Sequence, residues 1–128
     1  MSASTKTAIV TGGSRGIGRA ISLRLAKDGF AVVLNYLGNE EQANRTVADI
    51  EGMGGQALAV QGDVGIIEDV ERMFDTAKES FGGVDVVVNS AGIMPMLPIQ
   101  DADMDVFDKV INVNLRGTFI VLGQAANH

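Results

Sequence analysis

The segment from Thr11 to Gly18 has the composition of a phosphate-binding turn. It reads TGGSRGIG and stands between a short apolar run and a stretch of helical period. Glycine lets the backbone turn sharply and approach a pyrophosphate closely, and the N–H groups at a helix N-terminus favour negative charge. The alternative is a turn that only allows a strand and a helix to pack tightly. The residues expected to bind a nucleotide here are Gly12, Ser14, Arg15, Gly16, Ile17 and Gly18.

Arg15 and the end of the second apolar run bear on which nucleotide binds. In dinucleotide-binding domains that prefer NAD, an acidic residue after the second strand accepts hydrogen bonds from the ribose 2′-OH. Here Asn35 and Tyr36 end that run, and no acid follows until Glu40. A guanidinium in the turn could hold a 2′-phosphate through bidentate contacts. We therefore expect Arg15, Asn35 and Tyr36 to bind NADP(H). The alternative is a solvated Arg15 and a site for NAD(H).

The elements that would position these residues alternate along the chain. Four short apolar runs are continuous, as is typical of parallel strands covered on both faces, and they span residues 7–10, 31–34, 57–60 and 84–88. Segments of helical period follow each of them. The order βαβαβαβα predicts an α/β fold with a doubly wound parallel sheet, the Rossmann fold, whose ligands bind at the carboxyl ends of the strands. We expect residues 1–128 to form one such domain.

The helical segments have apolar stripes and end signals. Asn39, with Gln42 three residues on, is a predicted N-cap, and Gly29, Gly52 and Gly82 are predicted helix ends. The fourth helix is expected to run from about residue 104 to the end of the chain. The four stripes are Ile17, Ala20, Ile21 and Leu25; Ala43, Val47 and Ile50; Ile67, Val70, Phe74, Ala77 and Phe81; and Phe107, Val110, Ile111, Leu115 and Leu122.

The glycine turn resembles the TGxxxGxG motif of the short-chain dehydrogenase/reductase family, which includes 3-oxoacyl-thioester reductases, and it differs from the common fingerprint G-x-G-x-x-G. Two further motifs support the resemblance. Gly62-Asp63-Val64 follows the third apolar run, and the resemblance implies that Asp63 and Val64 contact adenine. The alternative is that Asp63 caps the next helix.

The motif after the fourth run, residues 89–92, is similar to the family's Asn-Asn-Ala-Gly, with Ser90 in place of the second Asn. The resemblance implies that Asn89, Ala91 and Gly92 lie against the nicotinamide ribose.

Asn114 is the candidate catalytic residue. The sequence Asn112-Val113-Asn114-Leu115-Arg116-Gly117 resembles the family's Asn-Val-Asn-Leu-x-Gly helix motif. The resemblance implies that Asn114 supports a water in a proton relay. An inward-facing Asn that only bonds a neighbouring loop is the alternative. Asn112 is expected to tie the helix to the sheet.

The family's remaining catalytic groups are a Tyr, a Lys four residues later that lowers the pKa of the phenol, and a Ser that orients the carbonyl. The chain has one tyrosine, Tyr36, and the residue four positions on is Glu40. We therefore expect residues 1–128 to be a truncated piece of a longer oxidoreductase, lacking turnover by itself.

Composition excludes several classes of function. The chain has no Cys and one His, His128, so disulfides and thiolate metal sites are excluded and no metal is expected. A net charge of −6 disfavours nucleic acid as a partner. No apolar run approaches the ~20 residues of a membrane span, and residues 1–6 have no signal-peptide core. We expect a cytoplasmic protein with no membrane partner.

Three interpretations follow. The leading one is an NADP-dependent carbonyl reductase or alcohol dehydrogenase that acts on a small-molecule carbonyl or alcohol and forms a homo-oligomer. The second is a stand-alone nucleotide-binding module, regulatory or vestigial, without catalytic activity. The third is a methyltransferase, which the glycine spacing and Arg15 disfavour because adenosylmethionine has no phosphate.

Overall fold

Four parallel strands form one sheet in the order β3-β2-β1-β4. The computed structural model describes residues 5–93, 99–101 and 103–128. The strands are β1 (Thr7–Thr11), β2 (Ala31–Tyr36), β3 (Ala57–Gln61) and β4 (Val86–Asn89). The order changes direction between β1 and β4, as in a doubly wound sheet. The predicted fold class is confirmed.

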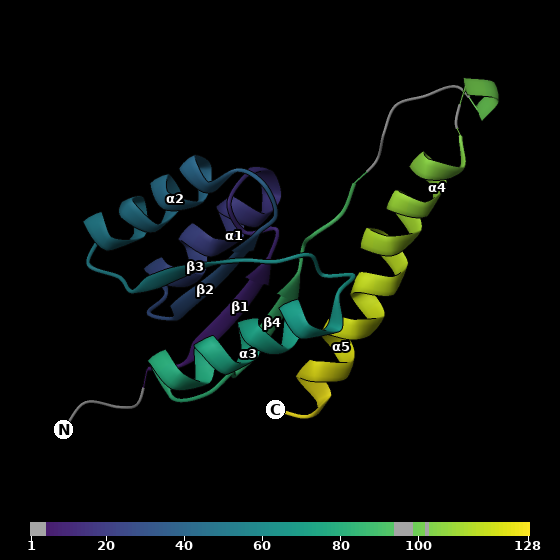
Figure 1. Ribbon diagram of the computed structural model, residues 1–128. Helices are drawn as coiled ribbons and strands as arrows, with labels where there is room; N and C mark the ends of the chain where they lie inside the picture. The colour runs from purple at the N-terminus through teal and green to yellow at the C-terminus, as the bar shows by residue number, and fades with distance from the viewer. Residues whose placement is uncertain (1–4, 94–98, 102) are drawn as a thin grey trace.

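Helices cover both faces of the sheet (Figure 1). The helical elements are α1 (Gly16–Lys27), α2 (Glu40–Gly52), α3 (Ile67–Phe81), a 3-10 turn (Ile99–Asp101), α4 (Met104–Val110), a π-helix (Ile111–Arg116) and α5 (Gly117–Ala126). Successive strand residues point to opposite faces. Ile9 and Val33 pack with α3 and α5, whereas Val10, Val32 and Leu34 pack with α1 and α2. This two-sided burial explains why the strands are continuously apolar.

Most predicted helix ends lie where the sequence signals placed them. Asn39 caps α2, its side chain accepting a hydrogen bond from the Gln42 N–H at 3.0 Å. Gly29 and Gly82 take positive φ angles of 96° and 90° after α1 and α3, a conformation that favours glycine. The predicted helix end at Gly52 is confirmed, because Gly52 is the last residue of α2. Gly54, two residues on, takes the left-handed conformation with φ 85°.

The stripe predicted for the last helix was wrong. The helix is continuous from α4 to α5, and α4 extends past the sheet (Figure 1). Phe107, Ile111, Leu115 and Leu122 are exposed, whereas Val121 is fully buried. A π-turn adds a residue to the helical turn, which rotates the downstream stripe by roughly 100° from the regular 3.6-residue period. The predicted stripe therefore failed in two places: on α4, which extends past the sheet and has no buried residues, and downstream of the π-turn.

Two further stripe residues lie in first turns at the carboxyl edge of the sheet. Ile17 is the second residue of α1 and Ile67 is the first residue of α3, and both side chains are exposed, as is Ala20. The buried face of α1 consists of Gly18, Ser22 and Ala26, with Ile21 and Leu25 partly buried beside it.

β4 begins two residues later than predicted and lies at the edge of the described sheet, and its residues are half-buried. Just before it, the Asp85 carboxylate accepts a hydrogen bond from the Thr7 N–H at 2.8 Å. Within the described ranges, no helix is both long enough and apolar enough to cross a membrane.

Candidate functional site

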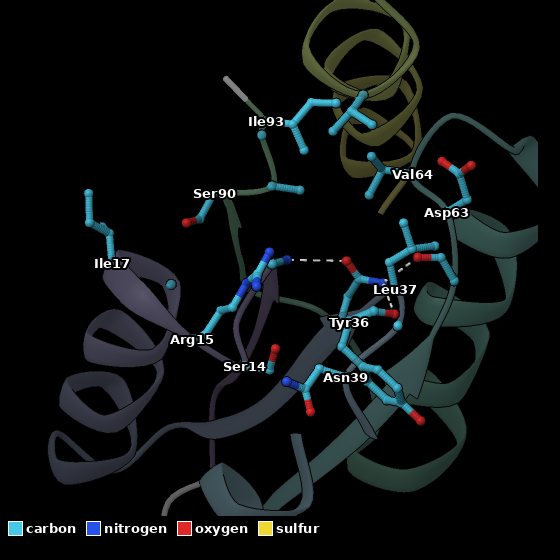
Figure 2. A pocket seen from close by; sticks show the side chains of 18 residues that line it. Ser14, Arg15, Ile17, Tyr36, Leu37, Asn39, Asp63, Val64, Ser90 and Ile93 are labelled. Atoms are coloured by element: carbon cyan, nitrogen blue, oxygen red, sulfur yellow. Dashed lines mark hydrogen bonds between the residues drawn. The ribbon is translucent and has the colours of Figure 1, made fainter. Parts of the chain in front are cut away.

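A pocket of about 570 Å³ opens at the carboxyl ends of all four strands (Figure 2). Its volume lies in the range of roughly 300–1,000 Å³ that is typical of ligand sites. Each strand contributes the segment that follows it, and the π-helix contributes one residue. The lining consists of Gly12, Ser14, Arg15, Ile17 and Gly18 after β1; Asn35, Tyr36, Leu37, Gly38 and Asn39 at the end of β2; Gly62, Asp63 and Val64 after β3; Ser90, Ala91, Gly92 and Ile93 after β4; and Val113.

The glycine turn is shaped by close backbone contacts. A Cβ at Gly18 would lie 2.0 Å from the Gly12 carbonyl oxygen, and one at Gly12 would lie 2.9 Å from Ala91 Cα. Gly12 and Gly16 take positive φ angles of 62° and 58°. A Cβ at Gly16 would meet no atom within 4 Å, so the turn faces open space there. These contacts fit a cradle that admits a phosphate group against the backbone.

Arg15 is the residue immediately before α1, with an extended backbone and an exposed side chain. Figure 2 shows its side chain reaching over the pocket between the glycine turn and the end of β2. Ile17, 78% exposed, projects from the first turn of α1 at the pocket wall. An apolar side chain this exposed beside a pocket is available to a ligand.

Asn35 is 2% exposed and joins three segments. Its Oδ1 accepts from the Gly12 N–H at 3.2 Å, and its Nδ2 donates to the Gly62 carbonyl at 2.9 Å (Figure 2). The amide is therefore committed to the protein on both sides. Asn35 lines the pocket but acts on a ligand chiefly by fixing the turns around it.

Asp63 does not cap α3. The N-cap of α3 is Ile66, without a side-chain hydrogen bond. The Asp63 carboxylate instead accepts from the Gly65 N–H at 2.8 Å and, at the longer distance of 3.4 Å, from Asn112 Nδ2. Asn112 thus ties the last helix to the loop after β3 rather than to a strand.

Asn89 holds the backbone behind the pocket instead of lining it. Its Oδ1 accepts from Thr11 Oγ1 at 2.8 Å, and its Nδ2 donates to Thr118 Oγ1 at 2.9 Å. Thr11 Oγ1 in turn accepts from the Ser90 and Ala91 N–H groups, each at 3.1 Å. Ala91 is consequently pressed against Gly12 at the floor of the site.

Asn114 is exposed, so the predicted inward position was wrong. Its amide forms a two-pronged contact with one backbone unit. Oδ1 accepts from the Ile93 N–H at 2.8 Å, and Nδ2 donates to the Ile93 carbonyl at 2.7 Å. Ile93 lines the pocket, so Asn114 fixes the pocket wall after β4.

Most of the residues predicted to bind the cofactor line this single pocket. Gly16, Asn89 and Asn114 do not line it, and their placement is described above. Sequence reasoning missed Leu37, Gly38, Asn39, Gly62, Ser90, Ile93 and Val113 as lining residues. The first three directly follow β2, and that position in a doubly wound sheet was an available signal. No local pattern distinguished Ile93 or Val113.

The arrangement is that of a doubly wound domain with a nucleotide cradle at its carboxyl edge, and the comparisons with known proteins agree. The family model described as short chain dehydrogenase matches residues 6–128. The chain is 46% identical over 123 residues to the 3beta-hydroxysteroid dehydrogenase 1 of Eggerthella lenta, an alignment that covers 96% of this chain and 47% of that protein. It is 43% identical to versicolorin reductase 1 of Dothistroma septosporum, with 96% and 47% covered.

Among solved structures, a short chain dehydrogenase from Burkholderia cenocepacia J2315 in complex with NADP superposes with a TM-score of 0.91 and is 43% identical, covering 96% of this chain and 50% of that one. The chain therefore belongs to the short-chain dehydrogenase family, whose members bind nicotinamide cofactors. It spans about half the length of the curated relatives that it matches.

We predict that Gly18→Ala in the intact protein disrupts the cradle. The added Cβ would meet the Gly12 carbonyl, and overpacking of this kind costs about 1–3 kcal/mol or more. The expected result is a lower free energy of unfolding in urea and a loss of nicotinamide-cofactor binding of at least about tenfold. Gly52→Ala is the control, because a Cβ there meets no atom within 4 Å. Unchanged cofactor affinity in Gly18→Ala would contradict the cradle.

Proposed function

We propose that the protein containing this chain is an NADP(H)-dependent oxidoreductase that transfers a hydride between the cofactor and a small-molecule carbonyl or alcohol. We further propose that it acts in the cytoplasm as a homo-oligomer. The residues described here bind and orient the cofactor. NADP(H), when bound, supplies or accepts the hydride.

The observation that carries the choice of NADP(H) is the charge around the end of β2. Tyr36, Leu37, Gly38 and Asn39 line that end of the pocket, and Arg15 faces them from the glycine turn (Figure 2). Asp63 is the one carboxylate among the residues that line the pocket, and it follows β3. A 2′-phosphate at the end of β2 would therefore meet a guanidinium without a neighbouring lining carboxylate.

The relatives support the reaction class. Two curated relatives carry the names 3beta-hydroxysteroid dehydrogenase 1 and versicolorin reductase 1, and one solved relative was found in complex with NADP. A dehydrogenase and a reductase perform the same hydride transfer in opposite directions.

The chain's own residues support this chemistry by position. The glycine turn and the N-terminus of α1 would hold the pyrophosphate, Asp63 and Val64 the adenine, and Ala91 and Gly92 the nicotinamide ribose. Asn114 belongs to the active site of the whole enzyme by resemblance, and here its amide fixes the backbone of Ile93. Exposed apolar side chains on α4, the π-helix and α5, among them Phe107, Leu115 and Phe119, support the proposal of a homo-oligomer.

We predict that Arg15→Ala removes the preference for NADPH. The intact protein should bind NADPH more tightly than NADH, and the variant should lose about tenfold or more in NADPH affinity, because one charge-assisted contact contributes roughly 1.5–3 kcal/mol. Fluorescence titration of both cofactors measures this. Arg24→Ala, on the exposed side of α1 and ion-paired with Asp28, is the matched control and should change neither affinity. Equal affinities for both cofactors before mutation would contradict the proposal.

We predict that Asn114→Ala in the intact enzyme lowers kcat by about tenfold or more and changes the Kd of NADPH by less than about threefold. The reason is that the residue is proposed to serve proton transfer rather than cofactor binding. Steady-state kinetics and cofactor titration separate the two quantities. Asn44→Ala, at an exposed position on α2, is the control. A stably folded Asn114 variant with normal turnover would show that its role is structural.

We predict that residues 1–128 expressed alone give no NADPH-dependent carbonyl reduction, since Tyr36 is the one tyrosine and Glu40 stands where a lysine would lower its pKa. The half-buried edge strand β4 and the exposed apolar residues of α4 and α5 should make this piece self-associate or fold loosely. Activity assays, sedimentation velocity and thermal melting test this. A monomer with a sharp, concentration-independent transition would favour the binding-module interpretation.

A further inference from the structure

Thr46 is a buried polar residue in the middle of α2, at a place where the helix otherwise packs apolar side chains. Its exposed fraction is 0%, and it shares the buried face of the helix with Ala43 and Ile50. Its Oγ1 lies 3.0 Å from the Gln42 carbonyl, a contact that a helical threonine commonly makes four residues back. A second contact leaves the helix altogether. Oγ1 lies 2.9 Å from the carbonyl oxygen of Ser14 in the glycine turn.

Arg19 and Asp49 complete this connection. Arg19 Nη1 donates to Thr46 Oγ1 at 2.8 Å, and Arg19 Nη2 forms an ion pair with Asp49 on α2. The hydroxyl therefore accepts from an α1 side chain while its single proton is shared between two carbonyl oxygens. The first turn of α1 and the middle of α2 are thus joined through Thr46, Arg19 and Asp49.

The carbonyl that Thr46 holds belongs to the peptide unit between Ser14 and Arg15. Both of these residues line the pocket, and Figure 2 shows their side chains on the same side of it as Asn39. Asn39 is the N-cap of α2. Thr46 consequently ties the glycine turn, which carries Ser14 and Arg15, to α2, the helix whose N-cap lines the same side of the pocket.

We infer that Thr46, supported by Arg19 and Asp49, is a positioning residue that sets the orientation of Ser14 and Arg15 toward the 2′-phosphate of the cofactor. This inference rests on the proposed NADP(H) function. The hydroxyl does not touch the ligand. It fixes the peptide from which the Arg15 side chain extends, so its loss weakens binding of the 2′-phosphorylated cofactor more than binding of the cofactor that lacks this group.

The test compares Thr46→Val with Thr46→Ser in the full-length protein, because valine keeps the shape without the hydroxyl and serine keeps the hydroxyl. Fluorescence titration should show the Kd of NADPH rising by about tenfold in Thr46→Val and the Kd of NADH by no more than about threefold. Thr46→Ser should restore the Kd of NADPH to within about twofold of the unmutated protein. The kcat at saturating NADPH should stay within about twofold in both variants.

A second pair of variants lies nearer the surface and keeps the inference testable if Thr46→Val fails to fold. Asp49→Asn removes the ion pair with Arg19. Glu41→Gln removes the ion pair with Arg45 on the same helix, and among the described residues that pair is bonded to no residue of the glycine turn. Asp49→Asn should raise the Kd of NADPH about threefold, and Glu41→Gln should leave it unchanged.

The outcomes separate the inference from the function on which it rests. An unmutated protein that binds NADH as tightly as NADPH would overturn the proposed function. If the unmutated protein prefers NADPH and Thr46→Val keeps the same preference, the positioning role of Thr46 is overturned while the proposed function stands. Where Thr46→Val does not fold, an unchanged preference in Asp49→Asn gives the same result.

Discussion

The buried amide of Asn35 is the contact on which the geometry of the site depends most. The carboxyl ends of parallel strands carry turns whose backbone groups have no partner within the sheet. Asn35, at the end of the central strand β2, accepts from Gly12 after β1 and donates to Gly62 after β3. A buried donor or acceptor left without a partner costs about 1–3 kcal/mol. One side chain therefore satisfies two turns and fixes the distance between the cradle and the loop after β3.

The turns after β1, β3 and β4 are each held by a polar side chain from a helix. Thr46 of α2 holds the Ser14 carbonyl, Arg116 donates to the Gly65 carbonyl at 2.8 Å, and Asn114 holds both backbone groups of Ile93. Loops at the edge of a sheet have few apolar contacts of their own. Hydrogen bonds from the helix side chains to the loop backbone therefore fix the orientation of these loops, which apolar packing alone would not fix. The pocket is consequently built from loops whose backbone is held by side-chain hydrogen bonds from the helices.

The π-helix has a structural consequence for this frame. It carries Asn112, Asn114 and Arg116 in six residues, and these side chains reach the loops after β3 and β4. π-turns within α-helices are frequently found at functional sites. Here the altered pitch places three polar side chains toward two loops, while Val121 downstream remains buried against the sheet. The same helix thus packs into the hydrophobic core through α5 and holds the loops of the pocket through the π-helix.

The sequence by itself determined the sheet, most of the helix ends and the position of the cradle, because these depend on local chemistry. Continuous apolar runs that alternate with helical segments are typical of strands covered by helices on both faces, and Gly29, Gly82 and Asn39 act within a single turn of chain. The tertiary structure decided the rest. The side-chain amides of Asn35 and Asn114 bond backbone groups that lie 21 to 27 residues away in the chain. Only the folded structure shows that these amides are used by the protein and are not free for a ligand. The burial of Thr46 and the exposure of Leu115 likewise depended on the approach of α1 to α2 and on a π-turn. Such long-range contacts leave no periodic signal in the sequence, since any residue that fits the space and satisfies the facing backbone groups can make them.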